Sequence, residues 1–301
     1  MGSQKNGDGA AHLTGRLRRR PDTDTLVVLT HGLGGSADGV YMRRAARVAD
    51  EMGLATLRLN LRGSAPEEFL PEAFPDGNTY QADFYHAGLS ADLGAALAAP
   101  ALRDFKKIFV LGYSLGGHMV LRLATEVNDP RVRAVAAVCP PIDLDRTVAG
   151  FDRPAAAVYR RYIFQGLFRL YEVVAAQRPL ALGVERIRKV RKVREWDALT
   201  IAPRFGFASP EDYYQRAGVR LADLRRPALV VVGEADPMVI SDANREALEK
   251  AKGNDLLEVH RVAHAGHIGF SPRVDLGLGE RPGLEAQIFD WFQGGRARDV
   301  G

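Results

Sequence analysis

Short apolar runs alternate with helical segments along most of this chain, and that alternation constrains the fold more than any other feature. Runs of this kind are typical of strands buried on both faces of a sheet. Alternating strands and helices predict an α/β fold, with a mainly parallel sheet and helices on both faces. The expected strands are residues 25–30, 54–59, 107–112, 132–138, 228–233 and 256–262, with residues 13–19 as an antiparallel edge strand. The expected helices are residues 38–52, 83–99, 241–251 and 285–292, and one that ends near residue 127.

One block breaks the alternation. Residues 142–226 contain helical stretches but no clear strand, and they stand between the fourth and fifth core strands. We therefore expect a helical cap inserted over the sheet. The predicted layout is a core of residues 12–141 and 227–295, this cap, a disordered leader of residues 1–11 and a tail of residues 296–301.

Charge and composition exclude several classes of protein. The 41 basic and 37 acidic side chains give a net charge of +4, an excess too small to indicate nucleic-acid binding. No run approaches the roughly 18–20 apolar residues of a membrane-spanning helix, and residues 1–11 lack the apolar core of a secretory signal. The single cysteine, Cys139, cannot form an internal disulfide and gives no sign of an oxidising compartment. We expect a cytoplasmic protein that acts on a small molecule.

Residues 112–116, with the sequence Gly-Tyr-Ser-Leu-Gly, fit the G-x-S-x-G pattern of a nucleophile elbow. In such an elbow the serine occupies a sharp strand-to-helix turn with strained backbone angles. The five residues alone are a weak signal, but here they stand between an apolar strand and a helix, which is the required context. A helix N-terminus also favours developing negative charge. The pattern predicts Ser114 as a nucleophile.

A serine hydroxyl needs a base, and a third group orients that base. In this kind of site the chain order is serine, acid, histidine. Asp236 follows the strand at 228–233, and His267 follows the next strand. Both are therefore expected on loops at the carboxyl edge of the sheet, where sites of open α/β sheets lie.

Other residues compete for these two roles. His264 lies three residues before His267 and could be the base instead. The acid could be Glu234, or Asp143, which follows the fourth strand. The simplest alternative for Asp236 is a turn residue before Pro237.

An oxyanion hole requires backbone N–H donors beside the nucleophile. One is expected from Leu115, the residue after Ser114, and the other from the Gly-rich turn at residues 31–35, with Leu33 as the donor. That turn lacks a G-x-G-x-x-G fingerprint and a P-loop lysine, so we do not expect it to bind phosphate. The histidines form no H-E-x-x-H or comparable pattern, and neither a metal nor an organic cofactor is expected.

Several motifs together resemble the YheT-like branch of the α/β hydrolases, also called the AB-hydrolase 4 group, over about residues 25–293. The motif that contains Arg-Glu-Trp-Asp and the paired tyrosines are more specific than the elbow. The resemblance implies an α/β-hydrolase fold with a triad of Ser114, Asp236 and His267, and carboxylesterase or lipid-ester hydrolase activity. Some relatives transfer acyl groups from acyl-CoA to alcohols. The matching segments are residues 31–35, 60–63, 85–88, 112–117, 193–197, 213–214, 235–237 and 266–270.

The expected cap contains a basic run at residues 186–194, in which six of nine residues are Arg or Lys. Ile187, Val190 and Val193 recur every three residues, which predicts a helix with an apolar stripe and a basic face. A solvated helix face is the simpler interpretation. The alternative is an anion site for an anionic lipid surface or for the phosphates of acyl-CoA. Aromatic residues of another expected cap helix could pack or line an acyl pocket: Tyr159, Tyr162, Phe164 and Phe168.

The sequence thus predicts a serine carboxylesterase that hydrolyses short- to medium-chain carboxylic or lipid esters through an acyl-enzyme. An acyl-CoA:alcohol O-acyltransferase or a thioesterase would use the same triad. A non-catalytic binding protein of the same fold is a further alternative, although every expected catalytic position is filled. Dehalogenase or epoxide-hydrolase chemistry is disfavoured, because those enzymes carry a carboxylate where Ser114 stands.

Overall fold

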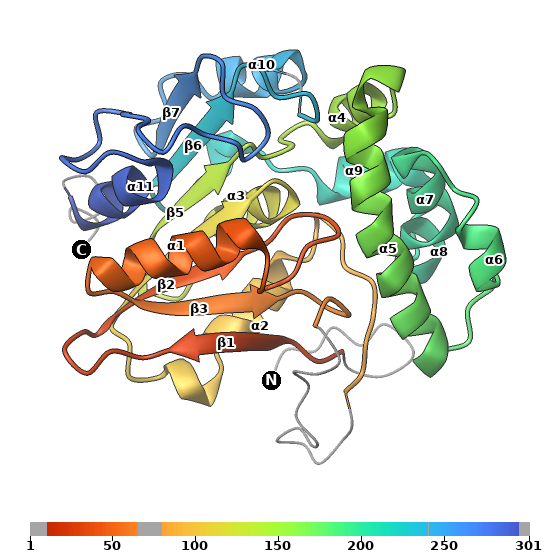
Figure 1. The fold of residues 1–301 in the computed structure, drawn as a ribbon, viewed down its shortest axis with the longest axis horizontal. Helices are drawn as coiled ribbons and strands as arrows, with labels where there is room; N and C mark the ends of the chain where they lie inside the picture. Colours follow the sequence, from red (N-terminus) through yellow and green to blue (C-terminus); the bar gives the residue numbers. More distant parts are fainter. Residues whose placement is uncertain (1–10, 66–79, 240, 295–301) are drawn as a thin grey trace.

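The computed structural model describes residues 11–65, 80–239 and 241–294, and a seven-stranded sheet forms the centre of this part of the chain. The strands lie in the order β1-β3-β2-β4-β5-β6-β7, with β1 antiparallel to β3 and every other neighbouring pair parallel. The α/β class and the antiparallel edge strand are confirmed (Figure 1). The strands are β1 (Thr14–Arg18), β2 (Thr25–Thr30), β3 (Ala55–Asn60), β4 (Lys107–Tyr113), β5 (Val132–Val138), β6 (Ala228–Gly233) and β7 (Leu257–Val262).

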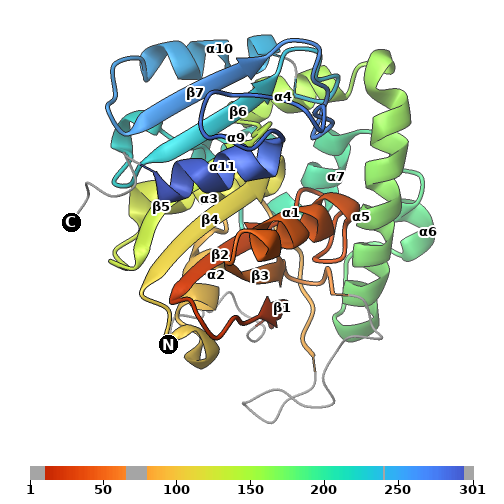
Figure 2. The same ribbon diagram turned by 60° about the vertical axis from the view of Figure 1, so that its left-hand side comes forward.

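Helices cover both faces of the sheet because its central strands are apolar on both sides. Along β2, Leu26 and Val28 belong to one buried cluster, and Val27 and Leu29 belong to the other. This division follows from the alternation of side chains along a strand. Helices α2 (Ser90–Leu97), α3 (Leu115–Glu126) and α10 (Ser241–Lys250) contribute to the first cluster, and α1 (Val40–Glu51) and α11 (Leu284–Gln293) to the second (Figure 2).

The segment between β5 and β6 is helical and contains no strand. We call residues 142–226 the cap segment. Figure 1 shows its helices grouped at one end of the sheet, where β2 and β3 end. Its division from the core as a separate unit stays a prediction. The helices are α4 (Leu144–Phe151), α5 (Ala157–Gln177), α6 (Val184–Ile187), α7 (Val193–Leu199), α8 (Ile201–Phe205) and α9 (Pro210–Ala217), with 3-10 turns at Pro154–Ala156 and Leu221–Asp223.

The helix predicted at residues 83–99 begins only at Ser90, so its first seven residues were assigned wrongly. Backbone N–H groups in the preceding stretch bond to side chains of the cap segment instead of forming a helix. Ala82 N donates to Gln177 Oε1 at 2.7 Å, and Ala87 N donates to the Tyr213 hydroxyl at 3.0 Å. These tertiary contacts take up two backbone donors, and the stretch before Ser90 has no regular secondary structure.

The predicted helix through the basic run is also wrong, because α6 ends at Ile187 and α7 begins only at Val193. The carboxylate of Asp152 fixes the start of α7, since it accepts hydrogen bonds from Val193 N at 2.7 Å and Arg194 N at 3.2 Å. The apolar stripe is nevertheless buried, because Ile187, Val190 and Val193 are each at most 5% exposed. The pattern of burial was therefore predicted correctly and the backbone conformation was not.

Two parts of the predicted layout cannot be compared with the structure. The leader, apart from residue 11, and the tail lie outside the described residues. Among the described helices, none combines the length and the hydropathy that crossing a membrane requires.

Candidate active site

Ser114 lies between the end of β4 and the start of α3, with φ 52° and ψ −121°. A positive φ is uncommon for a residue with a side chain and costs on the order of 1–3 kcal/mol. The flanking glycines make the turn possible. A Cβ on Gly116 would lie 2.5 Å from the His31 carbonyl oxygen, and one on Gly112 would collide with the Gly116 carbonyl. The expected strained strand-to-helix turn is present.

Asp236 and His267 lie on the loops after β6 and β7, and they are joined by a hydrogen bond. His267 Nδ1 lies 2.7 Å from Asp236 Oδ2. Met238 N and Val239 N donate to the other oxygen, Asp236 Oδ1, at 2.8 and 2.9 Å. An ionised carboxylate only accepts hydrogen bonds, so Nδ1 carries the proton and His267 Nε2 is left as the basic nitrogen.

Ser114 and His267 are not hydrogen-bonded to each other among the contacts of the described residues. Such bonds are often long before a substrate binds and tighten in the substrate complex. A proton transfer between the two therefore requires their side chains to approach each other. The structure brings the acid and the base together, and it places Ser114 at the same edge of the sheet.

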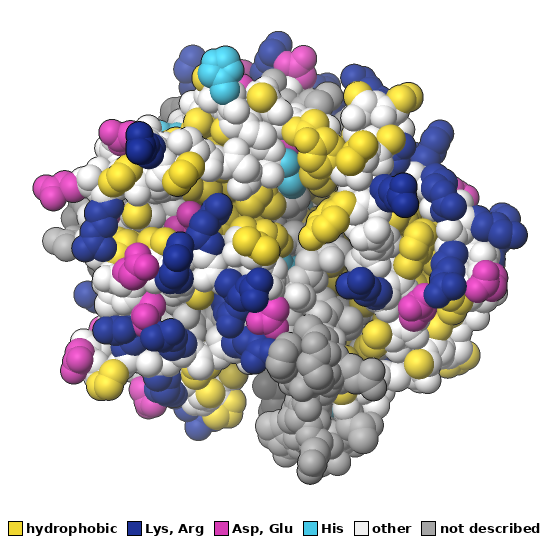
Figure 3. All heavy atoms as spheres, viewed as in Figure 1, with side chains coloured by type: hydrophobic (Ala, Val, Ile, Leu, Met, Phe, Trp, Pro, Cys, Tyr) yellow, Lys and Arg dark blue, Asp and Glu magenta, His cyan; other side chains and the backbone are white. Residues whose placement is uncertain are grey.

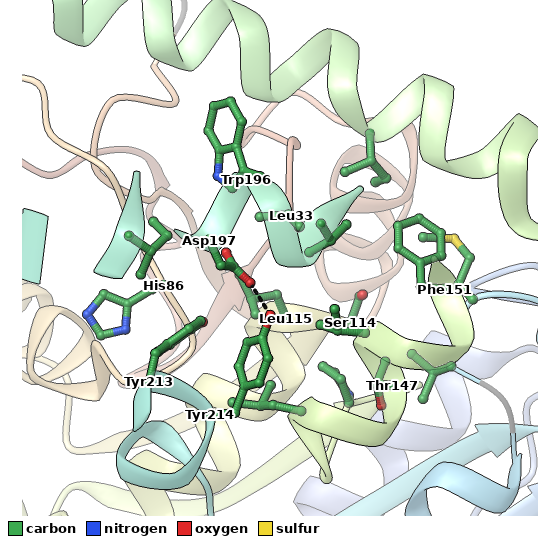
Figure 4. A pocket seen from close by; sticks show the side chains of 18 of the residues that line it. Leu33, His86, Ser114, Leu115, Thr147, Phe151, Trp196, Asp197, Tyr213 and Tyr214 are labelled. Carbon is green, nitrogen blue, oxygen red and sulfur yellow. Dashed lines mark hydrogen bonds between the residues drawn. The ribbon is translucent and has the colours of Figure 1, made fainter. Parts of the chain in front are cut away.

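Leu33 and Leu115 flank Ser114 and line the same cavity (Figure 4). Leu115 is the first residue of α3, so its N–H has no acceptor within the helix. The neighbours of Leu33 are both held by tyrosines, because Gly32 N donates to the Tyr41 hydroxyl at 3.1 Å and Gly34 N donates to the Tyr85 hydroxyl at 2.7 Å. Neither leucine N–H has an acceptor among the described residues, as an oxyanion hole requires.

His31 at the start of this turn is buried and was not expected to matter. Its Nε2 accepts a hydrogen bond from Leu61 N at 3.2 Å, and its Nδ1 donates to the Gly32 carbonyl at 2.8 Å. Burial lowers the pKa of His31 to about 4, although the bond to Gly32 opposes that shift. The imidazole is therefore neutral near pH 7, and it ties the turn that contains Leu33 to the loop after β3.

The cavity beside Ser114 encloses about 80 Å³ and is mostly apolar. Aliphatic and aromatic side chains from α4, α5, α7 and α8 line it, together with a few polar groups, so the cap segment forms much of its wall (Figure 4). A site of this composition suits an apolar ligand with a small polar reacting group. The apolar lining residues include Leu144, Val148, Phe151, Ile163, Val193, Trp196, Ile201 and Met238.

A sequence model described as "Alpha/beta hydrolase family" matches residues 27–275, most of the chain. The chain belongs to the alpha/beta hydrolase family. A seven-stranded sheet, an elbow serine and a histidine–aspartate pair at the carboxyl edge agree with this membership.

The relatives of this alpha/beta hydrolase include proteins named as esterases and lipases. It is 27% identical to "Putative esterase YheT" of Escherichia coli (strain K12), over 88% of this chain and 76% of the relative. This similarity confirms the YheT-like resemblance. It is 26% identical to "Embryogenesis-associated protein EMB8" of Picea glauca, over 91% of this chain but 59% of the relative. The chain thus spans about three fifths of that relative's length.

Solved structures show the same fold. The crystal structure of a monoacylglycerol lipase of Paleococcus ferrophilus is 19% identical and has a TM-score of 0.51, with 85% of this chain and 90% of that chain covered. A dienelactone hydrolase from Anabaena variabilis ATCC 29413 is also 19% identical with a TM-score of 0.51, and 95% and 93% are covered. At this level of identity the likeness extends to the fold alone, which is the predicted α/β-hydrolase fold.

The competing residues of this hydrolase have other surroundings. The Asp143 carboxylate caps α4, because Oδ1 accepts a hydrogen bond from Arg146 N at 2.9 Å. Glu234 and His264 are exposed, and neither side chain has a hydrogen-bond partner among the described residues. The geometry therefore favours Asp236 and His267 over all three.

Cys139 lies close to this pair, and sequence reasoning did not connect it with the site. Its Sγ, an Asp236 oxygen and a His267 nitrogen lie within 4.8 Å of one another, a spacing that could hold a metal ion. However, burial, with the nearby Asp236 carboxylate as a second cause, raises the pKa of the Cys139 thiol to about 12. The Cys139 side chain is therefore a neutral thiol near pH 7.

The paired tyrosines and the REWD motif meet inside the cavity. Asp197 and Tyr214 both line it, and the Tyr214 hydroxyl donates to Asp197 Oδ2 at 2.7 Å (Figure 4). Burial raises the pKa of Asp197 to about 7, partly offset by the Tyr214 hydrogen bond. The resemblance had marked these residues as specific to the family without giving them a role. No periodicity could have placed them beside Ser114.

The charged side chains of the basic run and the four aromatic side chains singled out on α5 do not line the cavity. None of the six Arg and Lys side chains at residues 186–194 lines it. Arg188 pairs with Glu172, and Arg194 pairs with Asp145 and Glu211. Phe164 and Phe168 pack around Trp196, as the packing interpretation predicted, whereas Tyr159 and Tyr162 are exposed.

Proposed function

We propose that this hydrolase is a serine carboxylesterase acting on short- to medium-chain carboxylic or lipid esters, with Ser114, His267 and Asp236 as its triad. The observation that carries the proposal is the 2.7 Å hydrogen bond between His267 Nδ1 and Asp236 Oδ2. It leaves a basic nitrogen at the edge of the sheet where Ser114 occupies its strained turn.

In the proposed reaction, His267 Nε2 takes the proton of Ser114 while Oγ forms a bond to the ester carbonyl carbon. The carbonyl π electrons move to oxygen, and the N–H groups of Leu33 and Leu115 stabilise the resulting oxyanion. Collapse breaks the carbon–alkoxy bond, and His267 gives the proton to the leaving alcohol. Water then attacks the acyl-enzyme with the same help. Asp236 fixes the imidazole tautomer and stabilises its charged form.

The cavity and the relatives support an ester with a modest apolar part. Its largely aliphatic and aromatic lining suits an acyl chain, and its volume of about 80 Å³ favours a short one. A relative in Saccharomyces cerevisiae, 21% identical, is named "Monoacylglycerol lipase", and one in Mus musculus, 25% identical, is named "Phospholipase ABHD3". For this chain we propose ester hydrolysis, but we do not assign it the specific substrate of either relative.

Acyl transfer to an alcohol is the second candidate. One relative, in Saccharomyces cerevisiae and 24% identical, is named "Medium-chain fatty acid ethyl ester synthase/esterase 2". An alcohol in place of water would take the acyl group from the same acyl-enzyme. Incubation with an acyl-CoA and ethanol tests this candidate. Ethyl ester as the main product would favour transfer, and free fatty acid with free CoA would indicate a thioesterase.

The test of the main proposal compares wild type and Ser114→Ala on p-nitrophenyl acetate and butyrate. We expect turnover to fall by a factor on the order of 10⁶, to background, because the nucleophile is lost. A p-nitrophenyl series of increasing chain length then measures the acyl preference. Equal activity in both proteins would overturn the assignment of Ser114. Inactivity of the wild type on every ester and on acyl-CoA would favour a non-catalytic binding protein.

A further inference from the structure

The large apolar side chains exposed on the described surface are not scattered. Val158 is 79% exposed, Val40 and Tyr162 are each 73% exposed, and Tyr159 is 45% exposed. All four lie in the first turns of α1 or α5. We call these four residues the rim patch. Val158 and Tyr162 are four residues apart on α5 and so share one side of that helix.

The two helix starts in the rim patch are brought together by a close backbone contact. The loop before α1 packs directly on α5, because a Cβ on Gly34 would lie 2.8 Å from the Ile163 carbonyl oxygen and one on Gly166 would lie 2.7 Å from Gly34 Cα. Burial raises the pKa of Tyr41 to about 12, and the nearby Tyr162 hydroxyl contributes to the rise. Tyr162 thus lies close to the first turn of α1. Figure 3 shows hydrophobic side chains gathered where α1 and α5 face each other.

The rim patch adjoins the cavity that Ser114 lines. Ile163, next to Tyr162 in the chain, and Leu33, in the loop between the two helix starts, both belong to the cavity wall. Exposed apolar surface that borders a substrate cavity is costly in water unless another surface covers it, and such patches mark interaction sites. Tyrosine is well suited to a boundary between water and lipid, because one end of its side chain is apolar and the other is polar.

Three exposed arginines are close in the chain to residues of the patch. Arg161 lies between Tyr159 and Tyr162 on α5, Arg153 precedes the 3-10 turn that leads into α5, and Arg43 follows Val40 by one helical turn. None of the three arginines forms an ion pair with a carboxylate among the described residues. Unpaired arginines around exposed Val and Tyr side chains form a basic, apolar surface, which complements an anionic lipid surface.

We propose that the rim patch and its three arginines bind this hydrolase to an anionic lipid bilayer, with the cavity next to the membrane. This surface differs from the basic run at residues 186–194, for which an anion site was the alternative to a solvated helix face. The delivery of lipid-phase esters to Ser114 rests on the proposed function, but binding to the bilayer does not.

The experiment measures co-sedimentation of the full chain with vesicles of phosphatidylcholine, with and without phosphatidylglycerol as the anionic lipid. The test variants are Val158→Ser/Tyr162→Ser and Arg161→Glu. The matched control is Arg103→Glu, an exposed arginine before β4 and hence at the edge of the sheet opposite to Ser114. Ser114→Ala is included to separate binding from catalysis.

We expect wild type, Ser114→Ala and Arg103→Glu to bind the anionic vesicles alike and to bind neutral vesicles weakly. Arg161→Glu should bind at least fivefold more weakly, since one cation near such a surface contributes about fivefold. The double variant should bind at least tenfold more weakly. It should keep its thermal midpoint and its rate on soluble p-nitrophenyl acetate, because both side chains are exposed, but it should lose activity on esters held in anionic vesicles.

Three outcomes would overturn the proposal. The first is equal binding of wild type and both rim variants to anionic vesicles. The second is wild-type binding that does not depend on phosphatidylglycerol. The third is a dimer, seen by analytical ultracentrifugation, that the double variant dissociates, because a second copy of the chain would then cover the patch. An inactive wild type that still binds vesicles would count against the proposed esterase function alone.

Discussion

The hydroxyl of Tyr214 donates a hydrogen bond to Asp197 Oδ2 at 2.7 Å, and both side chains line the cavity that contains Ser114. The cap segment therefore places an ionisable carboxyl group in a mostly apolar cavity. Charged and titratable groups around Asp197 are Tyr214 and Tyr213 on α9, Arg194 on α7 and Asp152 after α4. The burial of Asp197 has a larger effect on its pKa than any of these neighbours.

The first prediction concerns stability against pH. The pKa of Asp197 is raised from 3.8 to about 7, so the folded state holds a proton that the unfolded state releases between those values. The protonated Asp197 side chain therefore stabilises the folded state below pH 4. This stabilisation, about 4 kcal/mol at most, is lost as pH rises to about 7. Asp197→Asn cannot titrate. The free-energy difference between wild type and this variant should thus fall steadily from pH 4 to 7 in urea unfolding.

The prediction concerns the difference in unfolding free energy between two proteins, because other groups also titrate. Buried His31 and His86 have lowered pKa values, so they destabilise the folded state as pH falls, whereas Asp197 stabilises it. Their contributions cancel between wild type and Asp197→Asn. The matched control is Asp145→Asn, which removes an exposed carboxylate that also pairs with Arg194. It should keep the wild-type pH dependence. A pH-independent difference for Asp197→Asn would contradict the raised pKa.

The second prediction distinguishes Asp236 from Asp143 as the acid. Asp236→Asn keeps an oxygen for Met238 N and Val239 N but presents an amide that selects the wrong imidazole tautomer. We expect kcat on p-nitrophenyl esters to fall by about 10⁴ with little change in fold. Asp143→Asn loses only charge at a helix cap and should keep kcat within about twofold, since Asn caps as well as Asp. The reverse ranking of the two variants would make Asp143 the acid.

The third prediction concerns the turn at Ser114. Gly116→Ala would place a Cβ 2.5 Å from the His31 carbonyl oxygen and 2.6 Å from that of Thr30. We expect a loss of about 3 kcal/mol or more of stability and at least a hundredfold loss of kcat, because backbone must move at the elbow. Gly94→Ala, in α2 with open space around it, should instead stabilise by about 0.5–1 kcal/mol. Thermal unfolding and turnover measured on both variants check this prediction. Equal effects of Gly116→Ala and Gly94→Ala would contradict the close packing around Gly116.

The fourth prediction tests the turn that contains Leu33. Tyr85→Phe removes the hydroxyl that accepts from Gly34 N and leaves a half-buried N–H without that partner, at a cost of about 1 kcal/mol. Because Leu33 precedes Gly34, kcat should fall about tenfold while KM changes little. Tyr171→Phe removes a cap hydroxyl that donates to the Leu182 carbonyl outside the cavity. The control Tyr171→Phe should lower stability but leave kcat unchanged. A kcat loss of similar size in both variants would show that Tyr85 does not act through the oxyanion hole.

The order of strands and helices followed from local patterns. Strands such as β5 (Val132–Val138) and β6 (Ala228–Gly233) have the predicted bounds, because a run buried on both faces is visible as continuous apolar sequence. The first half of the helix predicted at residues 83–99 is absent, because Tyr213 in the cap segment accepts a hydrogen bond from Ala87 N and Gln177 accepts one from Ala82 N, just before the predicted start. The bonds that changed its conformation are non-local and leave no periodic signal.

The sequence by itself determined the parallel sheet, the strained turn at Ser114, and the placement of Asp236 and His267 at one sheet edge. All three depend on short spacings and on the rule that parallel strands share a carboxyl edge. Only the tertiary structure decided that Asp197 and Tyr214 enter the cavity, and that Val40 and Tyr162 lie on one rim. The physical reason is that burial and proximity arise when distant segments pack together. The pKa of Asp197 is raised because segments distant in the sequence bury it. Val40 and Tyr162 stay exposed because no distant segment covers them.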